Sequence, residues 1–228
     1  MKHIHTLCFD LDDTLWDMRA VIPRAEQALH DWFREHCPRV AERYDPEALQ
    51  ALRAATVRGN PQLRHNLGEL RRRMLRQILR DCGYAEAIAE DAFRVFYSAR
   101  NRVTLYADVE PALGRLARSH RLIAMSNGNA CLKTIGIERY FDAMLSATEL
   151  GAAKPDAGFF NRAVERTGID PAAALHIGDH PENDIAAAAE AGFGTVWVNR
   201  ADAAWPLATV RPDHELPTLA ELSELLRE

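Results

Sequence analysis

The sequence predicts an α/β fold, in which a parallel sheet is covered by helices on both faces and an all-helical segment is inserted near the start. Short, almost continuously apolar segments occur at the beginning and in the second half of the 228-residue chain. Runs of this kind are typical of strands buried on both faces. Helical periodicity alternates with these runs in the second half, whereas residues 18–103 show helical periodicity alone.

The expected strands lie at residues 4–10, 121–126, 174–179 and 194–198. Helices are expected between them over Pro111–Ser119, Ala157–Gly168 and Ile185–Gly192. The last two end at glycine, which is typical of a helix C-terminus. Because strands and helices alternate, the connections should be right-handed crossovers. The order therefore predicts a three-layer, Rossmann-like core with a parallel sheet in the middle.

The inserted segment is expected to contain four helices and no strand. These are Pro23–His36 with its proline in the first turn, a helix that Asp45 caps, Leu63–Cys82, and Ala85–Asn101. We interpret residues 18–103 as an inserted cap subdomain, and residues 1–17 with 104–228 as the α/β core. The alternative is an extra helical layer on one compact domain.

Composition is ordinary for a soluble globular protein, with 47% hydrophobic and 27% charged residues. A net charge of −5 gives no reason to expect a nucleic acid or an anionic membrane as partner. No apolar run approaches the roughly 20 residues of a membrane span, and the N-terminus lacks the features of a secretory signal. Four scattered cysteines indicate reduced thiols, so we expect a cytoplasmic protein.

Acidic residues gather where the first expected strand ends. Asp10 and Asp12 are two positions apart and point to the same side of an extended chain, whereas Asp13 points to the other side. Clustered carboxylates repel one another unless a hard cation joins them, and such cations prefer oxygen ligands. A solvated acidic turn is the alternative to a metal site at this position.

Further polar groups follow the other expected strands. Ser126 and Asn127 follow the second, and Asp179 and Asp184 follow the third. Lys154 comes after a stretch of small residues between them. Ligands of open α/β sheets bind at the carboxyl ends of the strands. Carboxylates, a hydroxyl and a lysine collected at that edge suit phosphoryl transfer, because cations neutralise phosphate charge.

The order D-x-D-x-T, S-N-G, K-P and G-D-x-x-x-x-D, found between residues 10 and 184, resembles the four motifs of the haloacid dehalogenase superfamily. The insertion resembles the helical C1-type cap that subfamily I carries between motifs one and two. Motifs one and two are also similar to those of bacterial phosphatases that act on flavin mononucleotide and on a riboflavin-pathway pyrimidine phosphate.

The resemblance implies a catalytic role for each matched residue. Asp10 is the expected nucleophile, which forms an aspartyl-phosphate. Asp12 is the expected general acid and then base. Lys154 is expected to neutralise Asp10 and the phosphate. On the substrate side the resemblance places Ser126 at the phosphoryl oxygens, with Asn127 and Thr14, the latter orienting the turn.

The same resemblance implies a Mg²⁺ site. Asp10, the backbone carbonyl of Asp12, and Asp179 are the expected ligands, with Asp184 close behind them. The expected reaction is hydrolysis of a small phosphorylated metabolite such as a flavin, nucleotide or sugar phosphate. No nucleic acid or membrane partner is expected, and the sequence leaves the oligomeric state open.

Three other functions remain open at this point: a 2-haloacid dehalogenase, a sugar phosphomutase, and a non-catalytic binding protein on the same fold. Asp12 and Thr14 argue against dehalogenation, which needs neither Mg²⁺ nor an acid at the position of Asp12. We also expect Trp16 and Asp17 to line the entry to the site, and Arg64 or His65 in the cap to meet the leaving group. The three arginines 71–73 should be mostly solvated.

Overall fold

The computed structural model describes residues 3–226. Contacts within the chain divide it into two compact units. One is an α/β unit built from the residues up to Asp17 and from Thr104 onward, and the other is a helical unit built from Met18–Val103. Each is described by itself.

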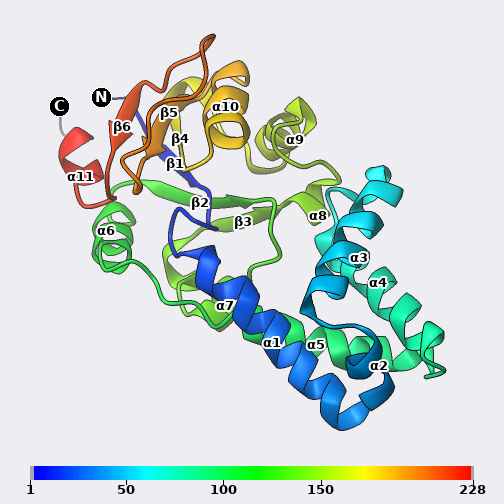
Figure 1. Cartoon of the computed structure of the whole chain (residues 1–228). Helices are drawn as coiled ribbons and strands as arrows, with labels where there is room; N and C mark the ends of the chain where they lie inside the picture. The colour runs from blue at the N-terminus through cyan, green and yellow to red at the C-terminus, as the bar shows by residue number, and fades with distance from the viewer. Residues whose placement is uncertain (1–2, 227–228) are drawn as a thin grey trace. The chain divides into compact units, whose positions relative to one another are not determined.

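A six-stranded, wholly parallel sheet forms the middle of the α/β unit (Figure 1). Its order is β3-β2-β1-β4-β5-β6. The strands are β1 Thr6–Phe9, β2 Arg121–Ser126, β3 Ala143–Ser146, β4 Ala174–Gly178, β5 Gly194–Val198 and β6 His214–Leu216. The four expected strands and their parallel arrangement are confirmed. The edge strands β3 and β6 were not expected, because they are short and one of them is largely polar.

Helices cover both faces of this sheet, which confirms the three-layer prediction. On one face α6 contacts α11, and on the other α9 packs against α10 (Figure 1). The helices of this unit are α6 Val109–Leu116, α7 Leu132–Ile135, α8 Ala147–Leu150, α9 Ala157–Thr167, α10 Ala187–Glu190 and α11 Leu222–Leu225, with 3₁₀ turns at Glu138–Tyr140 and Pro171–Ala173.

Alternate residues of the central strands supply the core beneath α9. Cys8 of β1 and Ile123 of β2 pack with Phe159 and Phe160 of α9, and all four side chains are buried. The intervening residue Leu7 is equally buried toward the other face. Burial on both faces explains why these strands are apolar without alternation.

One helix of the core differs from its prediction in a way that affects the site. A helix was expected over residues 185–192, but a π-helical turn at Pro181–Ala186 comes first and α10 follows. Single π-helical turns are common at functional sites, because they re-aim side chains. This turn contains Asp184, whose side chain it directs back toward β4.

The helical unit has a hydrophobic core of its own, to which Leu29 and Phe33 of α1, Leu75 of α4 and Phe96 of α5 contribute. Within the unit α1 packs along α5 (Figure 1). Its helices are α1 Met18–His36, α2 Pro38–Arg43, α3 Pro46–Gly59, α4 Leu67–Asp81 and α5 Ala89–Arg100, with 3₁₀ turns at Pro61–Leu63 and Glu86–Ile88.

Two local predictions for this unit need comment. The expectation that Asp45 caps a helix is confirmed, since its side chain accepts a hydrogen bond of 2.8 Å from the backbone of Ala48. The expected start of the first helix at Pro23 was wrong, because α1 begins at Met18 and Pro23 lies inside it. None of the helices in residues 3–226 is long and apolar enough to cross a membrane.

Candidate active site

The strand order creates a site where the chain changes direction. From β1 the chain moves outward to β2 and β3, and then returns to place β4 on the other side of β1. Crevices at the carboxyl ends of strands form at such switch points. Phe9 and Ile177 are paired across β1 and β4, so the polar residues that follow these two strands come side by side.

Lys154 is the centre of the buried part of the site. Its Nζ donates hydrogen bonds of 2.6 Å to Asp10 Oδ1 and 2.6 Å to Asp184 Oδ1, and one of 3.0 Å to the carbonyl of Met125. The lysine, Asp10 and Asp184 are all buried. One cation thus holds two carboxylates that are 174 positions apart in the sequence, from Asp10 to Asp184.

Burial and charge set the protonation of this cluster. Burial raises the pKa of Asp10 well above its ordinary value, and Asp184 adds to the shift although Lys154 opposes it. Burial alone would lower the pKa of Lys154, but the charges of Asp10 and Asp184 raise it overall. The pKa of Asp184 is lowered, because Lys154 and His176 together outweigh its burial. These shifts favour the charged forms of both Lys154 and Asp184.

Three carboxylates fit a divalent cation. Asp10, Asp179 and Asp184 each offer a ligand atom, and these atoms lie within 4.8 Å of one another. Burial raises the pKa of Asp179 to about 7, and the charges of Asp184 and Asp13 contribute to the rise. Such repulsion disappears when a cation joins the oxygens, and an all-oxygen donor set suits Mg²⁺. The donor chemistry therefore fits the expected metal.

The loop after β1 is a tight turn rather than an extended segment. Asp13 has a φ of 64°, in the left-handed region, and its backbone N–H donates to the carbonyl of Trp16 at 2.9 Å. The indole of Trp16 donates to Asp12 Oδ1 at 2.9 Å. Trp16 is fully buried, so the expectation that it lines the approach was wrong.

The turn also changes the interpretation of Asp13. An extended chain would direct its side chain away from the site. With the left-handed turn, Asp13 instead lines the same cavity as Asp10 and Asp12, and its charge acts on Asp179. The sequence argument failed here because β1 ends at Phe9, before the acids begin.

The three residues expected on the substrate side have different surroundings. Thr14 is fully buried, and its hydroxyl donates to Asp179 Oδ1 at 3.1 Å and to Asp10 Oδ2 at 3.4 Å. The amide of Asn127 pairs with the backbone N–H and carbonyl of Lys154, both at 2.8 Å. Thr14 and Asn127 thus hold other site residues in place. Ser126 lines the cavity, where its hydroxyl accepts from Gly128 N–H at 2.9 Å.

Several supporting residues carried no recognisable motif. His176 Nε2 lies 3.1 Å from Asp184 Oδ1, and Trp197 donates from its indole to the carbonyl of Asp179 at 2.7 Å. Arg200 donates to the carbonyl of Thr14 at 3.1 Å and pairs with both oxygens of Asp108. The spacing of residues in the sequence could not reveal their roles, because each contacts a residue on another segment of the fold.

A cavity of about 150 Å³ opens above these groups. Its lining combines the loops that follow β1, β2 and β4 with Lys154. His180 belongs to this lining, and its ring nitrogen Nδ1 accepts from the backbone N–H groups of Glu182 and Asn183, both at 3.3 Å. A space of this size accommodates a phosphoryl group among carboxylates, a hydroxyl and an ammonium group.

The arginines of the helical unit differ from one another. Arg64 is exposed. Arg71 is buried, donates to both oxygens of Glu26 and stacks over Phe96, so it is the exception to the expectation that most of arginines 71–73 are solvated. Arg72 and Arg73 pair with Glu90 and Glu69 near the surface.

A comparison with known families and proteins agrees with this geometry. Residues 4–192 match a model of haloacid dehalogenase-like hydrolases. The chain is 30% identical, over 99% of its length and 98% of the relative's, to 5-amino-6-(5-phospho-D-ribitylamino)uracil phosphatase YigB of Escherichia coli. It is 32% identical to a phosphoserine phosphatase of Thermus thermophilus, over 70% of this chain and 67% of that one.

A solved structure is also similar over almost the whole chain. It is described as a 2-haloacid dehalogenase from Pseudomonas syringae pv. Tomato DC3000. The two chains superpose with a TM-score of 0.92 and 38% identity, covering 98% of each.

Proposed function

This chain belongs to the haloacid dehalogenase-like hydrolase family, and from that membership we propose that it is a Mg²⁺-dependent phosphatase that hydrolyses small phosphomonoesters through an aspartyl-phosphate on Asp10. The contact of Lys154 with Asp10 is the observation that carries the proposal. The buried ammonium group lies 2.6 Å from Asp10, opposes the effect of burial on its pKa and so favours the carboxylate form, which is the nucleophile. It also attracts the charged phosphoryl group that must approach it.

In the first step, an oxygen of Asp10 attacks phosphorus and the bond from phosphorus to the ester oxygen breaks. Asp12, protonated, donates its proton to the departing alkoxide, so that the leaving group departs as an alcohol. The Trp16 indole holds the Asp12 side chain in place for this transfer at 2.9 Å. Lys154 and the hydroxyl of Ser126 contact the phosphoryl oxygens.

In the second step, Asp12 is a carboxylate and takes a proton from water as that water attacks phosphorus. The bond from phosphorus to the Asp10 oxygen breaks, which releases inorganic phosphate and regenerates the carboxylate of Asp10 and the protonated side chain of Asp12. Asp10, Asp179 and the backbone carbonyl of Asp12 would hold Mg²⁺, with Asp184 behind them. When bound, the cation supplies positive charge that stabilises the transferring phosphoryl group.

For the substrate class we propose a phosphorylated metabolite such as a flavin, nucleotide or sugar phosphate. The support is the similarity, over almost the full chain, to a phosphatase named for a ribitylaminouracil phosphate. Residues 18–103 are proposed to serve as the cap that selects the leaving group, and a cytoplasmic location suits such a substrate.

A 2-haloacid dehalogenase is the second candidate, because the structure with a TM-score of 0.92 bears that name. Dehalogenation requires an aspartate nucleophile but no proton donor for the departing halide. A dehalogenase would therefore not need Asp12 as a proton donor, whereas a phosphatase needs an acid at that position. For this reason we prefer the phosphatase.

The deciding experiment measures two products in parallel. Phosphate release is followed from a panel of phosphomonoesters with Mg²⁺, and chloride release from (S)-2-chloropropionate with and without it. We expect phosphate release only, which Asp10→Asn abolishes and Asp12→Asn lowers by about 10²–10⁴-fold. Chloride release without Mg²⁺ would contradict the phosphatase, and an isomerised sugar phosphate without free phosphate would indicate a mutase. Catalysis that survives in Asp10→Asn would refute the whole assignment.

A further inference from the structure

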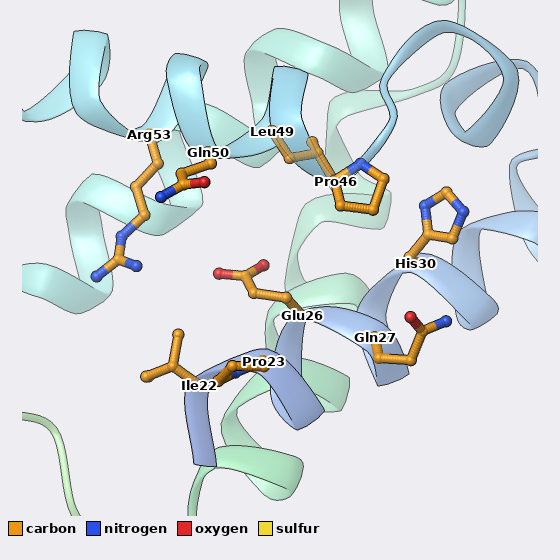
Figure 2. A pocket seen from close by; sticks show the side chains of 9 residues that line it. All are labelled: Ile22, Pro23, Glu26, Gln27, His30, Pro46, Leu49, Gln50 and Arg53. Atoms are coloured by element: carbon orange, nitrogen blue, oxygen red, sulfur yellow. The ribbon is translucent and has the colours of Figure 1, made fainter. Parts of the chain in front are cut away.

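The helical unit contains a cavity of about 360 Å³ that the proposed chemistry does not use. It lies between one face of α1 and one face of α3 (Figure 2). Ile22 and Leu49 contribute apolar walls, while Glu26, His30 and Arg53 contribute polar groups. All its lining residues belong to Met18–Val103.

The cavity exists because α3 packs loosely on α1. Among the residues of α3, Leu49 alone is buried. The α1 residues of the lining recur at helical spacing and those of α3 do so as well, so two helix faces look at each other across the space (Figure 2). Well-packed interiors have few voids larger than a water molecule.

Charge in this cavity is not balanced. Both oxygens of Glu26 accept from Arg71, at 2.7 and 3.1 Å, so one carboxylate is already matched by one guanidinium. Arg53 is the second guanidinium, and within residues 3–226 it has no hydrogen bond or ion pair. Burial lowers the pKa of Arg71, and the charge of Arg53 lowers it further although Glu26 opposes both. Glu26, Arg53 and Arg71 together thus carry one positive charge in excess, although Arg71 does not itself line the cavity and Arg53 is exposed to solvent.

A hydrogen-bonding atom in the lining also lacks a partner. His30 Nδ1 is buried and has no hydrogen-bond partner within residues 3–226. Buried polar atoms are normally paired, so this nitrogen is available to hydrogen-bond a molecule in the cavity. Gln50, one turn from Arg53 on α3, adds an amide that can both donate and accept (Figure 2).

We propose that this cavity binds a small organic oxyanion with an apolar body. The anionic group, a carboxylate or a phosphate, pairs with Arg53, whose planar fork matches two oxygens of such a group. The apolar body contacts Ile22 and Leu49, and His30 or Gln50 hydrogen-bonds its polar atoms. This site lies wholly within the helical unit and does not depend on the proposed function.

The test uses matched probes on the full chain. Binding of 3-methylbutanoate, of its neutral amide and of inorganic phosphate is measured by titration calorimetry and by saturation-transfer NMR. We expect the carboxylate to bind about tenfold more tightly than the amide, because a charge-assisted hydrogen bond is lost in the amide. Arg53→Gln should remove that difference. Arg58→Gln, on the same helix but outside the lining, should leave it unchanged.

Each outcome decides the proposal. Phosphate binding that Arg53→Gln weakens and Arg58→Gln does not would support a phosphate as the anionic group, while carboxylate binding with the same dependence would support a carboxylate. Equal affinity for acid and amide would overturn the proposal. Binding that Arg53→Gln does not affect would also overturn it. So would the absence of binding by all three probes at a concentration about 50 times a Kd of ~1 mM.

Discussion

Lys154 is the residue that connects the two sides of the site, because it touches the carboxylate after β1 and the carboxylate after β4 at equal distances of 2.6 Å. A buried lysine without such partners would lose its charge. With two carboxylates beside it, its pKa is raised instead. The two carboxylates therefore keep Lys154 charged, and Lys154 in turn holds both carboxylates in position.

His176 illustrates how a residue outside the motifs can act through them. It is fully buried in β4, and its Nε2 contacts Asp184 Oδ1 at 3.1 Å. We predict that His176→Phe lowers kcat for phosphate release about tenfold with little change in KM, because Asp184 then holds Lys154 less firmly. His176→Gln, which keeps a donor at this position, should restore most of the loss. Equal activity of Phe and Gln variants would argue for a purely structural role.

Asp179 gives a pH-dependent prediction whose sign follows from its pKa. Burial and the nearby Asp184 raise that pKa to about 7 in the folded chain, against about 4 when unfolded. The folded state therefore binds the proton more tightly, and this carboxyl lowers stability as pH rises from 4 to 7. In EDTA, Asp179→Asn should raise Tm, and more at pH 8 than at pH 5.

Magnesium provides the control for this experiment. The cation should raise the Tm of the parent chain at pH 8 and much less at pH 5, because the ligand must be deprotonated. Asp179→Asn should lose most of that response. If Asp179→Asn had a lower Tm than the parent in EDTA at pH 8, the predicted stabilisation would be contradicted.

At the scale of the elements, the end of β4 and the π-helical turn after it work together. Gly178 closes β4, and a Cβ built there would lie 2.4 Å from Cγ of Asp184. The missing side chain is what lets the turn bring Asp184 back over the strand. The Asp184 carboxylate is buried and paired with Lys154. If it moved to make room for a Cβ at position 178, that contact would be disturbed.

We therefore predict that Gly178→Ala lowers phosphate release at least tenfold and lowers Tm, since Asp184 must shift by several tenths of an ångström or more. Gly114→Ala is the matched control. Gly114 lies within α6, where a Cβ would meet the ring of Tyr140 at an ordinary 3.7 Å. That change should keep activity and stabilise the protein by up to about 1 kcal/mol. Full activity in Gly178→Ala would show that Asp184 does not need its present position.

For the whole molecule, the division into two units predicts separate folding. Residues 18–103 form one continuous segment with its own buried core, which includes Phe33 and Leu75. We expect a fragment of these residues to be helical by circular dichroism and to unfold cooperatively. Leu75→Ala in the fragment should destabilise it by about 2–5 kcal/mol. A gradual, non-cooperative melt of the unaltered fragment would contradict this.

The sequence by itself determined the four central strands, the all-helical segment between the first two of them, and the positions of the motif residues. Strands buried on both faces must be apolar throughout, and ligand-binding polar groups lie at their carboxyl ends. Both features are therefore visible as local patterns in the sequence. Those patterns were sufficient for the parallel sheet and for Asp10, Ser126, Lys154 and Asp179 at one edge of it. The edge strands β3 and β6 show no such pattern, because they are short and only partly buried.

Only the tertiary structure decided how those residues meet. The left-handed turn at Asp13, the approach of Asp184 over Gly178, and the support from His176 and Arg200 all join segments that are distant in sequence or depend on backbone geometry. Periodicity reports which face of an element is buried, but it does not report which side chain of another element lies against it. The motif identified the carboxylates that line the site, and the packing of the sheet determines their partners and their pKa shifts.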